Sequence, residues 1–525
     1  MSPILCVLCQ PPVCFSRLIS RSPDALVRGT RGGSIHYTES ILAGSKGTPE
    51  GVPWRAGRHF VLKLFTFTLM FCAVAYAQSL ASTPSAISNV VIVGGTLIDV
   101  RNGQEIKNSA VFIRGERIAQ VGVVGKLEIP RDARIVDAHG KWILPGLVDM
   151  HAHVSMDDSD LLPLELYLVN GVTTIRDPGG YVSVARLAKE DIDSGKRIGP
   201  RLFFCGDILD GMRPVVAQGS LLVDTPERAR SAVIFLADQG VDCIKVYNNV
   251  KEPELKEIIA TARARNLPVI GHVPRTITMT HAVELGMQSL EHIRITGREL
   301  LPLDEANQID SLPFAKRETL LWQRFDVESE KLRQLVSFLA KRSVALDPTL
   351  AVDEDAFSLS RDDQINNQNN RYLPPQLLEK WKREPIPEFD NLPAELKQAG
   401  IDGFEKRKKF IAMCAKAGVR IITGTDGAFW GTLLPGFGLQ HELQLLVHSG
   451  LTPLQAIQAA TLNSAQTLGK ERELGQVAPG YFADLVILEA DPLEEIGNAS
   501  RIDLVMKAGQ SYKPADLTKG LGVSH

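Results

Sequence analysis

Four histidines of this 525-residue chain stand where a metal site needs them. His151 and His153 form an HxH pair, and residues two apart on a strand project from the same face. His272 and His292 each close a short apolar run, VIGH and SLEH. Imidazole is a common ligand of Zn²⁺ and related divalent ions, and the absence of a Cys cluster argues against a structural zinc. The pattern predicts a divalent metal site with a catalytic role.

Two further residues fit the same site. Asp426 ends the run VRIITGTD, and Lys245 lies inside DCIKVY. A carboxylate is a metal ligand as it stands, whereas a lysine ammonium has no lone pair to offer. Each has an ordinary alternative: Asp426 as an N-cap, and Lys245 as an ammonium paired with a carboxylate such as Asp242. The full candidate set is His151, His153, Lys245, His272, His292 and Asp426.

Short apolar runs that alternate with helical patterns must position these residues. The expected strands are 147–154, 172–177, 201–208, 242–247, 267–274, 288–293, 343–350 and 419–426. Eight strands alternating with helices predict an α/β protein, a (β/α)8 TIM barrel, rather than an open sheet. Barrel enzymes keep their active sites at the carboxyl ends of the strands. The histidines and Asp426 stand at those ends, and Lys245 stands on the fourth strand.

The remaining segments suggest how the domains divide. Residues 89–145 and 473–510 consist of β-branched runs cut by Gly and charged turns, which predicts strands. We expect these two flanks to form one small β-sandwich domain beside a barrel at 146–472. The barrel would carry insertions at about 300–340 and 353–418, and long insertions in compact domains are usually lids or disordered segments.

The amino-terminal part has the anatomy of a secretory signal. Residues 64–75 form the apolar run LFTFTLMFCAVA, with basic residues before it and Ala75-Tyr76-Ala77 and Gln78 after it. About 12 apolar residues are too few to span a bilayer, which takes about 20. We therefore expect a signal peptide at 61–77, a periplasmic or secreted protein, and no stable membrane anchor. Residues 1–60 show no periodicity and are interpreted as an untranslated or disordered extension.

Composition narrows the function classes. The chain is 44% hydrophobic and 23% charged with a net charge of −3, which is ordinary for a globular protein and indicates no nucleic-acid partner. Four of the seven cysteines precede residue 78, and Cys205, Cys243 and Cys414 are far apart, so no disulfide framework is predicted. The expected partner is a small-molecule substrate. The sequence leaves the oligomeric state open, a homo-oligomer included.

Other polar residues carry a weaker signal. A histidine taken alone, such as His139 or His448, is more often an ordinary core or surface residue than a ligand. Tyr247 and Arg275 follow candidate ligands and either contact substrate or lie in solvent. Asp484, in GYFADLVIL, is interpreted as a turn residue of the sandwich.

Taken together, the ordered motifs resemble the amidohydrolase superfamily of metal-dependent hydrolases. The matching text is PGLVDMHAHV, CIKVY, VIGHVP, SLEHI, TGTDGA, then HELQLLVHSGLTPLQAIQAATLNSAQTLG and LGQVAPGYFADLVIL. The resemblance covers about residues 89–510 and is most similar to the imidazolonepropionase-like and dipeptidase-like branch. It implies that His151, His153 and Asp426 hold a buried metal and that His272 and His292 hold a more exposed one. It further implies that Lys245 is carboxylated to a carbamate that bridges two Zn²⁺ ions.

The resemblance also implies a reaction. Two cations that share a water lower its pKa from ~15.7 toward ~7, and the resulting hydroxide attacks a carbonyl. Asp426 would take the proton and deliver it to the leaving amine. We expect cleavage of a C–N bond in a dipeptide, an N-acyl amino acid or a cyclic amide. The alternatives are a lactonase or phosphotriesterase, a non-catalytic metal- or ligand-binding barrel, and a metal-dependent isomerase or decarboxylase.

Overall fold

The computed structural model describes residues 89–156, 162–358, 361–383, 391–427 and 433–521. The expected extension at 1–60 and the expected signal peptide at 61–77 lie outside the described residues. All described residues belong to one unit of the chain, Pro84–His525. None of the described helices is long and apolar enough to cross a membrane.

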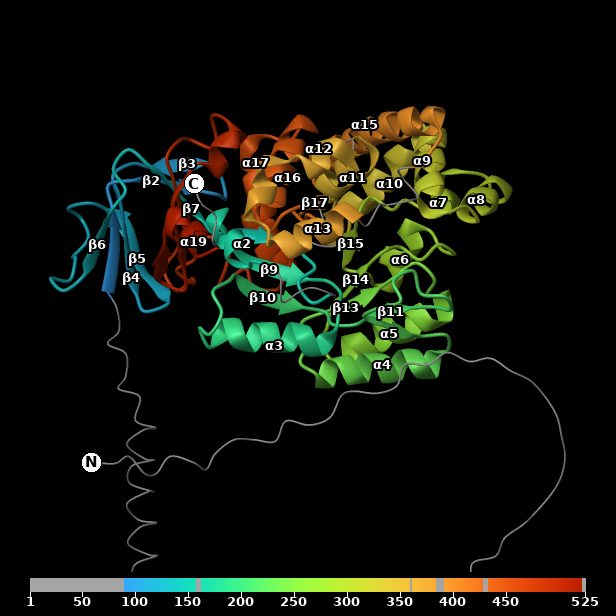
Figure 1. Cartoon of the computed structure of the whole chain (residues 1–525), viewed down its shortest axis with the longest axis horizontal. Coiled ribbons are helices and arrows are strands. Elements are labelled where there is room, and N and C mark those ends of the chain that lie inside the picture. Colours follow the sequence, from blue (N-terminus) through green and yellow to red (C-terminus); the bar gives the residue numbers. More distant parts are fainter. Residues whose placement is uncertain (1–88, 157–161, 359–360, 384–390, 428–432, 522–525) are drawn as a thin grey trace, which may run out of the picture. The chain divides into compact units, whose positions relative to one another are not determined.

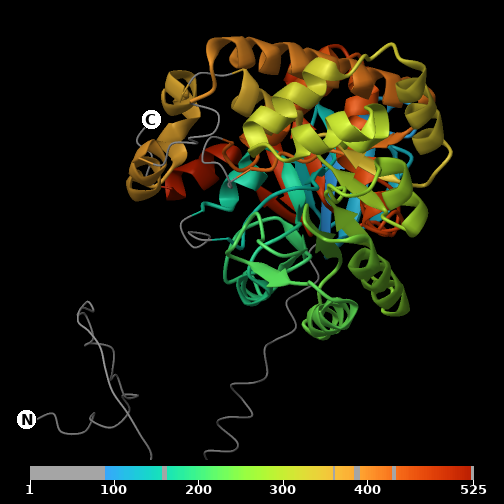
Figure 2. The same cartoon turned by 90° about the vertical axis from the view of Figure 1, so that its right-hand side faces the viewer.

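Parallel strands lie at the centre of the molecule, with helices around them (Figure 2). One sheet has the order β10-β9-β8 and the other the order β12-β11-β13-β14-β15-β16-β17. Hydrogen bonds connect both edges of the three-stranded sheet to the other sheet. The Met150 N–H, after β8, donates to the Thr423 carbonyl at 2.7 Å, and the Asp242 N–H donates to the Phe204 carbonyl of β10 at 2.8 Å. The strands are β8 (Leu147–Asp149), β9 (Val172–Asp177), β10 (Arg201–Phe204), β11 (Ile208–Asp210), β12 (Ser220–Leu222), β13 (Ile244–Val246), β14 (Val269–Gly271), β15 (Ser289–Glu291), β16 (Ala345–Asp347) and β17 (Arg420–Ile421).

Burial explains why these strands read as continuous apolar runs. Every residue of β13, β14, β15 and β16 is buried, as expected for parallel strands covered on both faces. Several strands are shorter than the sequence predicts. The reason is that the residue after the last ladder pair leaves the sheet, as His272 does after β14 and His292 after β15. The carboxyl ends of the strands are thereby free to present side chains.

The helices follow their sequence signals. Helix α4 (Pro226–Asp238) begins at an N-cap, Thr225, whose side chain accepts from the Arg228 N–H, and it buries Ala229 and Val233 four residues apart. The other helices between the strands are α2 (Glu165–Val169), α3 (Val182–Asp193), α5 (Glu252–Ala264), α6 (Met279–Leu285), α10 (Glu330–Ala340) and α15 (Ala394–Ala417), with α16 (Phe437–His448) after β17.

Both insertions contain helices (yellow and orange in Figure 2). The first has α7 (Gly297–Leu300), α8 (Leu303–Asp310) and α9 (Phe314–Arg324) before α10. The second has α11 (Leu350–Phe357), α12 (Arg361–Ile365) and α13 (Pro375–Arg383) before α15. Because α10 and α15 directly precede β16 and β17, each insertion ends in a helix that belongs to the alternating β/α pattern.

The amino- and carboxyl-terminal flanks lie together (blue and red in Figure 1). Strand β7 pairs antiparallel with β18, and Ile143 stands opposite Ile487. A second sheet packs against this one around a shared apolar core that includes Ile92, Ile113, Ile143, Ile487 and Met506. The first sheet is β20-β19-β18-β7-β2-β3 and the second is β5-β4-β1-β6. Their strands are β1 (Asn89–Val93), β2 (Thr96–Asp99), β3 (Gln104–Ile106), β4 (Ser109–Arg114), β5 (Arg117–Val123), β6 (Arg134–Asp137), β7 (Trp142–Pro145), β18 (Leu485–Leu488), β19 (Ile502–Lys507) and β20 (Gln510–Tyr512).

Candidate metal centre

The six candidate residues line one cavity of about 540 Å³. All six are buried, and they come from five strands of the barrel. In chain order they follow β8 (His151, His153), lie within β13 (Lys245), follow β14 (His272) and β15 (His292), and follow β17 (Asp426). The structure therefore brings together residues that are up to 275 positions apart in the sequence.

Asp426 lies among the imidazole rings. Its Oδ1 is 3.1 Å from His153 Nε2 and 3.4 Å from His151 Nε2. Its Oδ2 is 3.8 Å from His292 Nε2. The ring of His272 completes the group, with its centroid 4.7 Å from that of His292. One carboxylate and four imidazoles thus converge on one small volume.

The other nitrogen of each ring is held from behind. His151 Nδ1 is 2.9 Å from Glu291 Oε2, and His153 Nδ1 is 2.7 Å from the Gly179 carbonyl oxygen. An acceptor at Nδ1 keeps the proton there and leaves the Nε2 lone pair directed at the shared volume.

The same arrangement holds in the other two histidines. His272 Nδ1 is 2.9 Å from Asn248 Oδ1, and His292 Nδ1 is 2.6 Å from Thr349 Oγ1. Metal-binding histidines in proteins usually have such partners, which fix the tautomer and the ring orientation.

Burial keeps three of these rings neutral. It lowers the pKa of His151 to about 4, with Lys245 as the next cause, and it lowers the pKa values of His272 and His292 well below the usual value. His153 differs: burial opposes protonation, but the hydrogen bond with Asp426 raises its pKa. Neutral imidazole is the form that ligates a metal, so burial prepares these side chains for that role.

Asp426 and Lys245 respond to the same surroundings. Burial disfavours the Asp426 carboxylate, but the neighbouring His151 and His292 hold its pKa well below the usual range. Burial lowers the pKa of Lys245 to about 8. Within the described part of the chain no residue forms a hydrogen bond or ion pair with the Lys245 amine. Asp242, the alternative partner, instead accepts from the Phe204 N–H at 2.9 Å.

The backbone at the site is unusual in conformation. Asp426, His292 and Thr349 have positive φ values of 54°, 59° and 46°, a region that costs side-chain-bearing residues free energy. The Asp426 N–H donates to the His151 carbonyl at 2.8 Å, which fixes this conformation. Such conformations cluster at functional sites because surrounding contacts must hold them.

The donor set fits divalent metal ions. Ligand atoms of His151, His153 and Asp426 lie within 4.8 Å of one another. His272 Nε2 is buried and has no hydrogen-bond partner among the described residues. A buried nitrogen of this kind is costly unless something binds it. Nitrogen and carboxylate oxygen donors are those that Zn²⁺ and related ions prefer.

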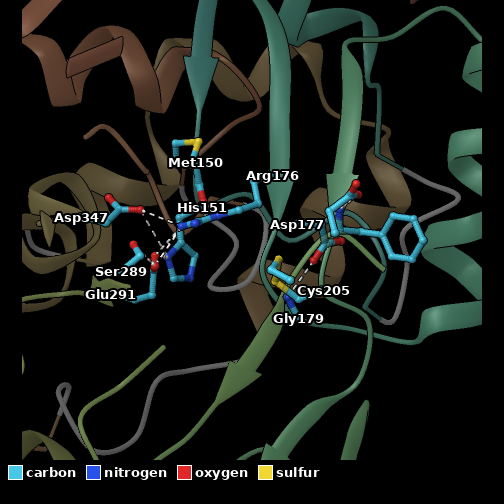
Figure 3. Close-up of a disulfide and its surroundings, with 12 residues drawn as sticks. Met150, His151, Arg176, Asp177, Gly179, Cys205, Ser289, Glu291 and Asp347 are labelled. Atoms are coloured by element: carbon cyan, nitrogen blue, oxygen red, sulfur yellow. Dashed lines mark hydrogen bonds and ion pairs between the residues drawn. A yellow bond between two sulfur atoms is a disulfide. The ribbon is translucent and has the colours of Figure 1, made fainter. Parts of the chain in front are cut away.

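A second acidic group lies behind the first but does not fit a metal. His151, Glu291 and Asp347 also have ligand atoms close together. However, Arg176 Nη2 is 2.9 Å from both Glu291 oxygens and 3.7 Å from Asp347 Oδ2 (Figure 3). Burial would raise the pKa of Glu291, but Arg176 and then His151 lower it well below its usual range. The guanidinium already occupies the place of a cation.

Of the polar residues with a weaker signal in the sequence, one lines the cavity and the others do not. Tyr247 lines the cavity and stacks on His272 with centroids 3.9 Å apart, whereas Arg275 does not line it. His139 and His448 are exposed and remote from the cavity. Asp484 is buried and accepts from the Ala508 N–H at 2.7 Å. Asp426 is not the N-cap of the next described helix, since Gly436 caps α16.

The sequence analysis predicted no disulfide framework and did not foresee the disulfide bond that the structure contains. Cys205 and Cys243 are bonded, with Cα atoms 4.5 Å apart (Figure 3). Cys205 directly follows β10 and Cys243 directly precedes β13, and the Asp242 N–H bonds to the Phe204 carbonyl between them. Neighbouring barrel strands bring together cysteines that are 38 positions apart, which sequence spacing alone does not reveal. Cys414 is free and buried.

The sequence analysis also missed the residues that hold the ligands. Asn248, Glu291 and Thr349 contact ring nitrogens, and Arg176 holds Glu291. Glu291 directly precedes a candidate ligand on the same strand, so its polarity inside an apolar run was a usable signal. The others lie on loops or on another strand, and no spacing rule connects them to a histidine.

Comparisons with known proteins identify the family of this chain. Residues 142–511 match the model of the amidohydrolase family. An ochratoxinase from Aspergillus niger is 26% identical over 500 residues, which cover 83% of this chain and 88% of that protein. An adenine deaminase 2 from Agrobacterium fabrum is 25% identical over 415 residues, 76% of this chain and 53% of that protein.

Solved structures show the same fold. A bottromycin amidohydrolase superposes with a TM-score of 0.66 at 22% identity, covering 83% of this chain and 91% of the other. A putative prolidase from Bifidobacterium longum gives 0.62 at 22%, covering 83% and 98%. The expected TIM barrel with a flanking domain is thereby confirmed at the level of architecture. Because the family model matches well over half of the chain, the protein belongs to the amidohydrolase family and is a hydrolase acting on carbon–nitrogen bonds.

Proposed function

We propose that this amidohydrolase binds two divalent cations, Zn²⁺ in the native protein, and cleaves the C–N bond of a small amide. The observation that carries the proposal is the convergence of four imidazoles and Asp426 on one cavity that also contains the buried Lys245. His151, His153 and Asp426 would hold one cation, and His272 and His292 the other. When bound, the cations lower the pKa of a water toward neutrality and polarise the amide carbonyl.

Lys245 would bridge the two positions as a carbamate. Its neutral amine adds to CO₂ with loss of one proton, which gives an anionic group with two oxygen donors. Burial favours the neutral amine, since it lowers the pKa of Lys245 to about 8. An anionic bridge also offsets the repulsion between two cations that lie only a few Å apart.

The protein's own groups would carry the protons. Asp426 lies between the two pairs of histidines, so its carboxylate can accept a proton from the attacking water and release it to the leaving nitrogen. The rings stay oriented through Nδ1, and the burial of all six residues limits competing water in the site.

The rest of the cavity supports a substrate with both an apolar part and a carboxylate. Its wall includes Ile208, Val215, Phe314 and Phe357. Its charged residues beyond the candidate ligands are Arg294, Asp353 and Asp355. A guanidinium recognises a carboxylate through charge-assisted hydrogen bonds. We therefore favour N-acyl amino acids and dipeptides over cyclic amides.

Metal analysis of the purified protein, combined with a hydrolysis screen, tests the proposal. The screen covers N-acyl amino acids, dipeptides, cyclic amides, lactones and a phosphotriester. We expect about two divalent ions per chain and the fastest turnover on a carboxylate-bearing amide. Fastest turnover on a lactone or phosphotriester would overturn the proposed substrate. Bound metal without any hydrolysis would indicate a binding protein.

We also infer that the protein is exported. The inference rests on the apolar run at 64–75 followed by Ala75-Tyr76-Ala77, and it is supported by the Cys205–Cys243 disulfide, a bond typical of oxidising compartments. Amino-terminal sequencing of protein from its native host should begin at or near Gln78. A cytoplasmic chain that retains the segment before Gln78 would contradict export.

A further inference from the structure

A buried network of charges lies directly behind His151 (Figure 3). Glu291 Oε2 is 2.9 Å from His151 Nδ1. Arg176 Nη2 donates to both Glu291 oxygens at 2.9 Å, and Ser289 Oγ donates to Oε1 at 2.7 Å. Arg176 Nε donates to the Met150 carbonyl at 2.7 Å, which fixes the guanidinium itself. The Glu291 carboxylate is therefore held from three sides.

This network lies outside the cavity of the candidate metal centre. Arg176, Ser289 and Glu291 do not line the cavity that contains the candidate ligands. The Arg176 and Glu291 side chains are at most 3% exposed. Any effect of these residues on the reaction is therefore indirect, through the hydrogen bond to His151 or through their charges acting on Lys245.

His151 differs in this respect from the other three histidines. Neutral groups stand behind those rings: the Gly179 carbonyl, the Asn248 amide oxygen and the Thr349 hydroxyl. A carboxylate also approaches His153, but Asp177 Oδ1 is 3.9 Å from its Nδ1, beyond hydrogen-bond distance. Of the four candidate ligand histidines, His151 is the one whose Nδ1 lies within hydrogen-bond distance of a carboxylate, Glu291.

A carboxylate behind a ligating imidazole makes the ring a stronger donor, and loss of such a partner typically weakens metal binding 10- to 100-fold. Burying a lone carboxylate would be costly, so it needs a cationic partner with well-placed donors. Arg176 meets that need. The pair adds no net charge to the site, yet it places the negative member against the ring.

We propose that the Arg176–Glu291 pair is a positioning element for His151, and that it makes the His151/His153 position the tighter of two metal positions. This inference rests on the proposed metal centre. It goes further by assigning unequal affinities to the two halves of the centre and by naming residues outside the cavity that set the difference.

The test uses Glu291→Gln in the full-length mature protein. Both Glu291 oxygens accept hydrogen bonds, and glutamine replaces one of them with a donating NH₂ group. Asp347 Oδ2, 3.7 Å from Arg176, can offset the guanidinium charge once the Glu291 charge is removed, so we expect the variant to fold. Metal affinities are measured by competition with a chromophoric chelator, and the melting temperature is recorded on the metal-free form.

We expect Glu291→Gln to lower the affinity for one of the two Zn²⁺ ions by about 10- to 100-fold and to leave the affinity for the other unchanged. Arg176→Lys keeps the charge but loses the Nε–H bond to the Met150 carbonyl that fixes the guanidinium, so it should weaken binding of the same ion by a smaller factor. The control is Asp484→Asn. It disrupts another carboxylate–arginine pair, in which the buried Asp484 lies 3.4 Å from the partly buried Arg201 and which touches no candidate ligand. It should lower stability without changing either metal affinity.

The outcomes separate the two proposals. If Glu291→Gln lowers the melting temperature as the control does and leaves both affinities unchanged, the pair is only structural and the inference is wrong. Equal weakening of both ions would also overturn it. If the unaltered protein binds no Zn²⁺ at all, the proposed metal centre itself fails. Should Glu291→Gln not fold, Arg176→Lys decides the question by the same measurement.

Discussion

The His151/His153 half of the site and the His272/His292 half have different surroundings. The first follows β8 inside the barrel, and Arg176 and Glu291 stand behind it. The second is held by neutral groups on loops. Arg294, which follows two residues after His292, lies against the wall formed by the insertions. We infer from this difference that the first half is the tighter cation position and that the second half is the one beside the substrate.

Removing Lys245, the proposed bridge between the two halves, should have the largest effect on activity. Lys245→Ala eliminates the proposed bridge, so we expect kcat to fall on the order of 10²- to 10³-fold, the size expected when a main electrostatic group is lost. At least one metal should be lost as well. Metal analysis and steady-state kinetics measure both.

Two further observations sharpen this test. Short carboxylic acids should partly restore the activity of Lys245→Ala, because they can occupy the vacated bridge. Lys245→Arg should also be inactive, since a guanidinium remains cationic and cannot bind a metal ion. If Lys245→Ala keeps both metals and normal turnover, the two halves are not bridged through this residue.

The next effect concerns the substrate side. Arg294, Arg317 and Arg407 share two carboxylates, Glu318 and Asp353, through ion pairs of 3.2 to 3.6 Å. Of the three arginines only Arg294 lines the cavity. Asp353 and Asp355 also line the cavity, and Asp355 has an interaction of its own. Loss of either Arg294 or Arg317 leaves two arginines for two carboxylates, so both variants should fold.

We expect Arg294→Met to lower kcat/KM for an N-acyl amino acid by about 10- to 100-fold, the equivalent of one charge-assisted hydrogen bond. The corresponding carboxamide substrate should be little affected. Arg317→Met is the matched control and should retain the preference for the carboxylate. If both variants prefer the carboxylate substrate over the carboxamide to the same extent, Arg294 does not recognise the substrate. If Arg294→Met instead raises kcat/KM for cationic substrates, Asp353 is the residue of this wall that contacts the substrate.

The sequence revealed the architecture and the candidate ligands more readily than their supports. The barrel was predictable because each ligand ends or occupies an apolar run, and strand order is a regular consequence of alternation. The contacts behind the rings depend on tertiary packing. Arg176 reaches Glu291 across the barrel interior, 115 positions away, and the Cys205–Cys243 bond joins adjacent strands. Local patterns do not encode such pairings, which arise only when the ring of strands closes.

The smallest effect is on how the stability of the metal-free protein depends on pH. His272 and His153, one from each half, should change this dependence in opposite directions. Burial lowers the pKa of His272 well below its value of 6.5 in the unfolded chain. Below pH 6.5 the unfolded state therefore binds more protons, and the stabilisation present above pH 6.5 is lost as the pH falls. His272→Gln does not titrate. Between pH 7.5 and 5 the unaltered protein should lose about 2 kcal/mol more stability than this variant.

His153 should behave in the opposite way. Burial disfavours its proton, but the hydrogen bond with Asp426 raises its pKa above 6.5. The folded state then binds more protons, so its contribution is complete below pH 6.5 and is lost as the pH rises through the folded pKa. Relative to His153→Gln, the unaltered protein should lose stability between pH 6 and 8. Urea unfolding of chelator-treated protein at each pH measures both differences, and the exposed His448→Gln serves as the control. If both variants changed the pH dependence of stability in the same direction, the contact with Asp426 would not raise the pKa of His153 in the metal-free protein.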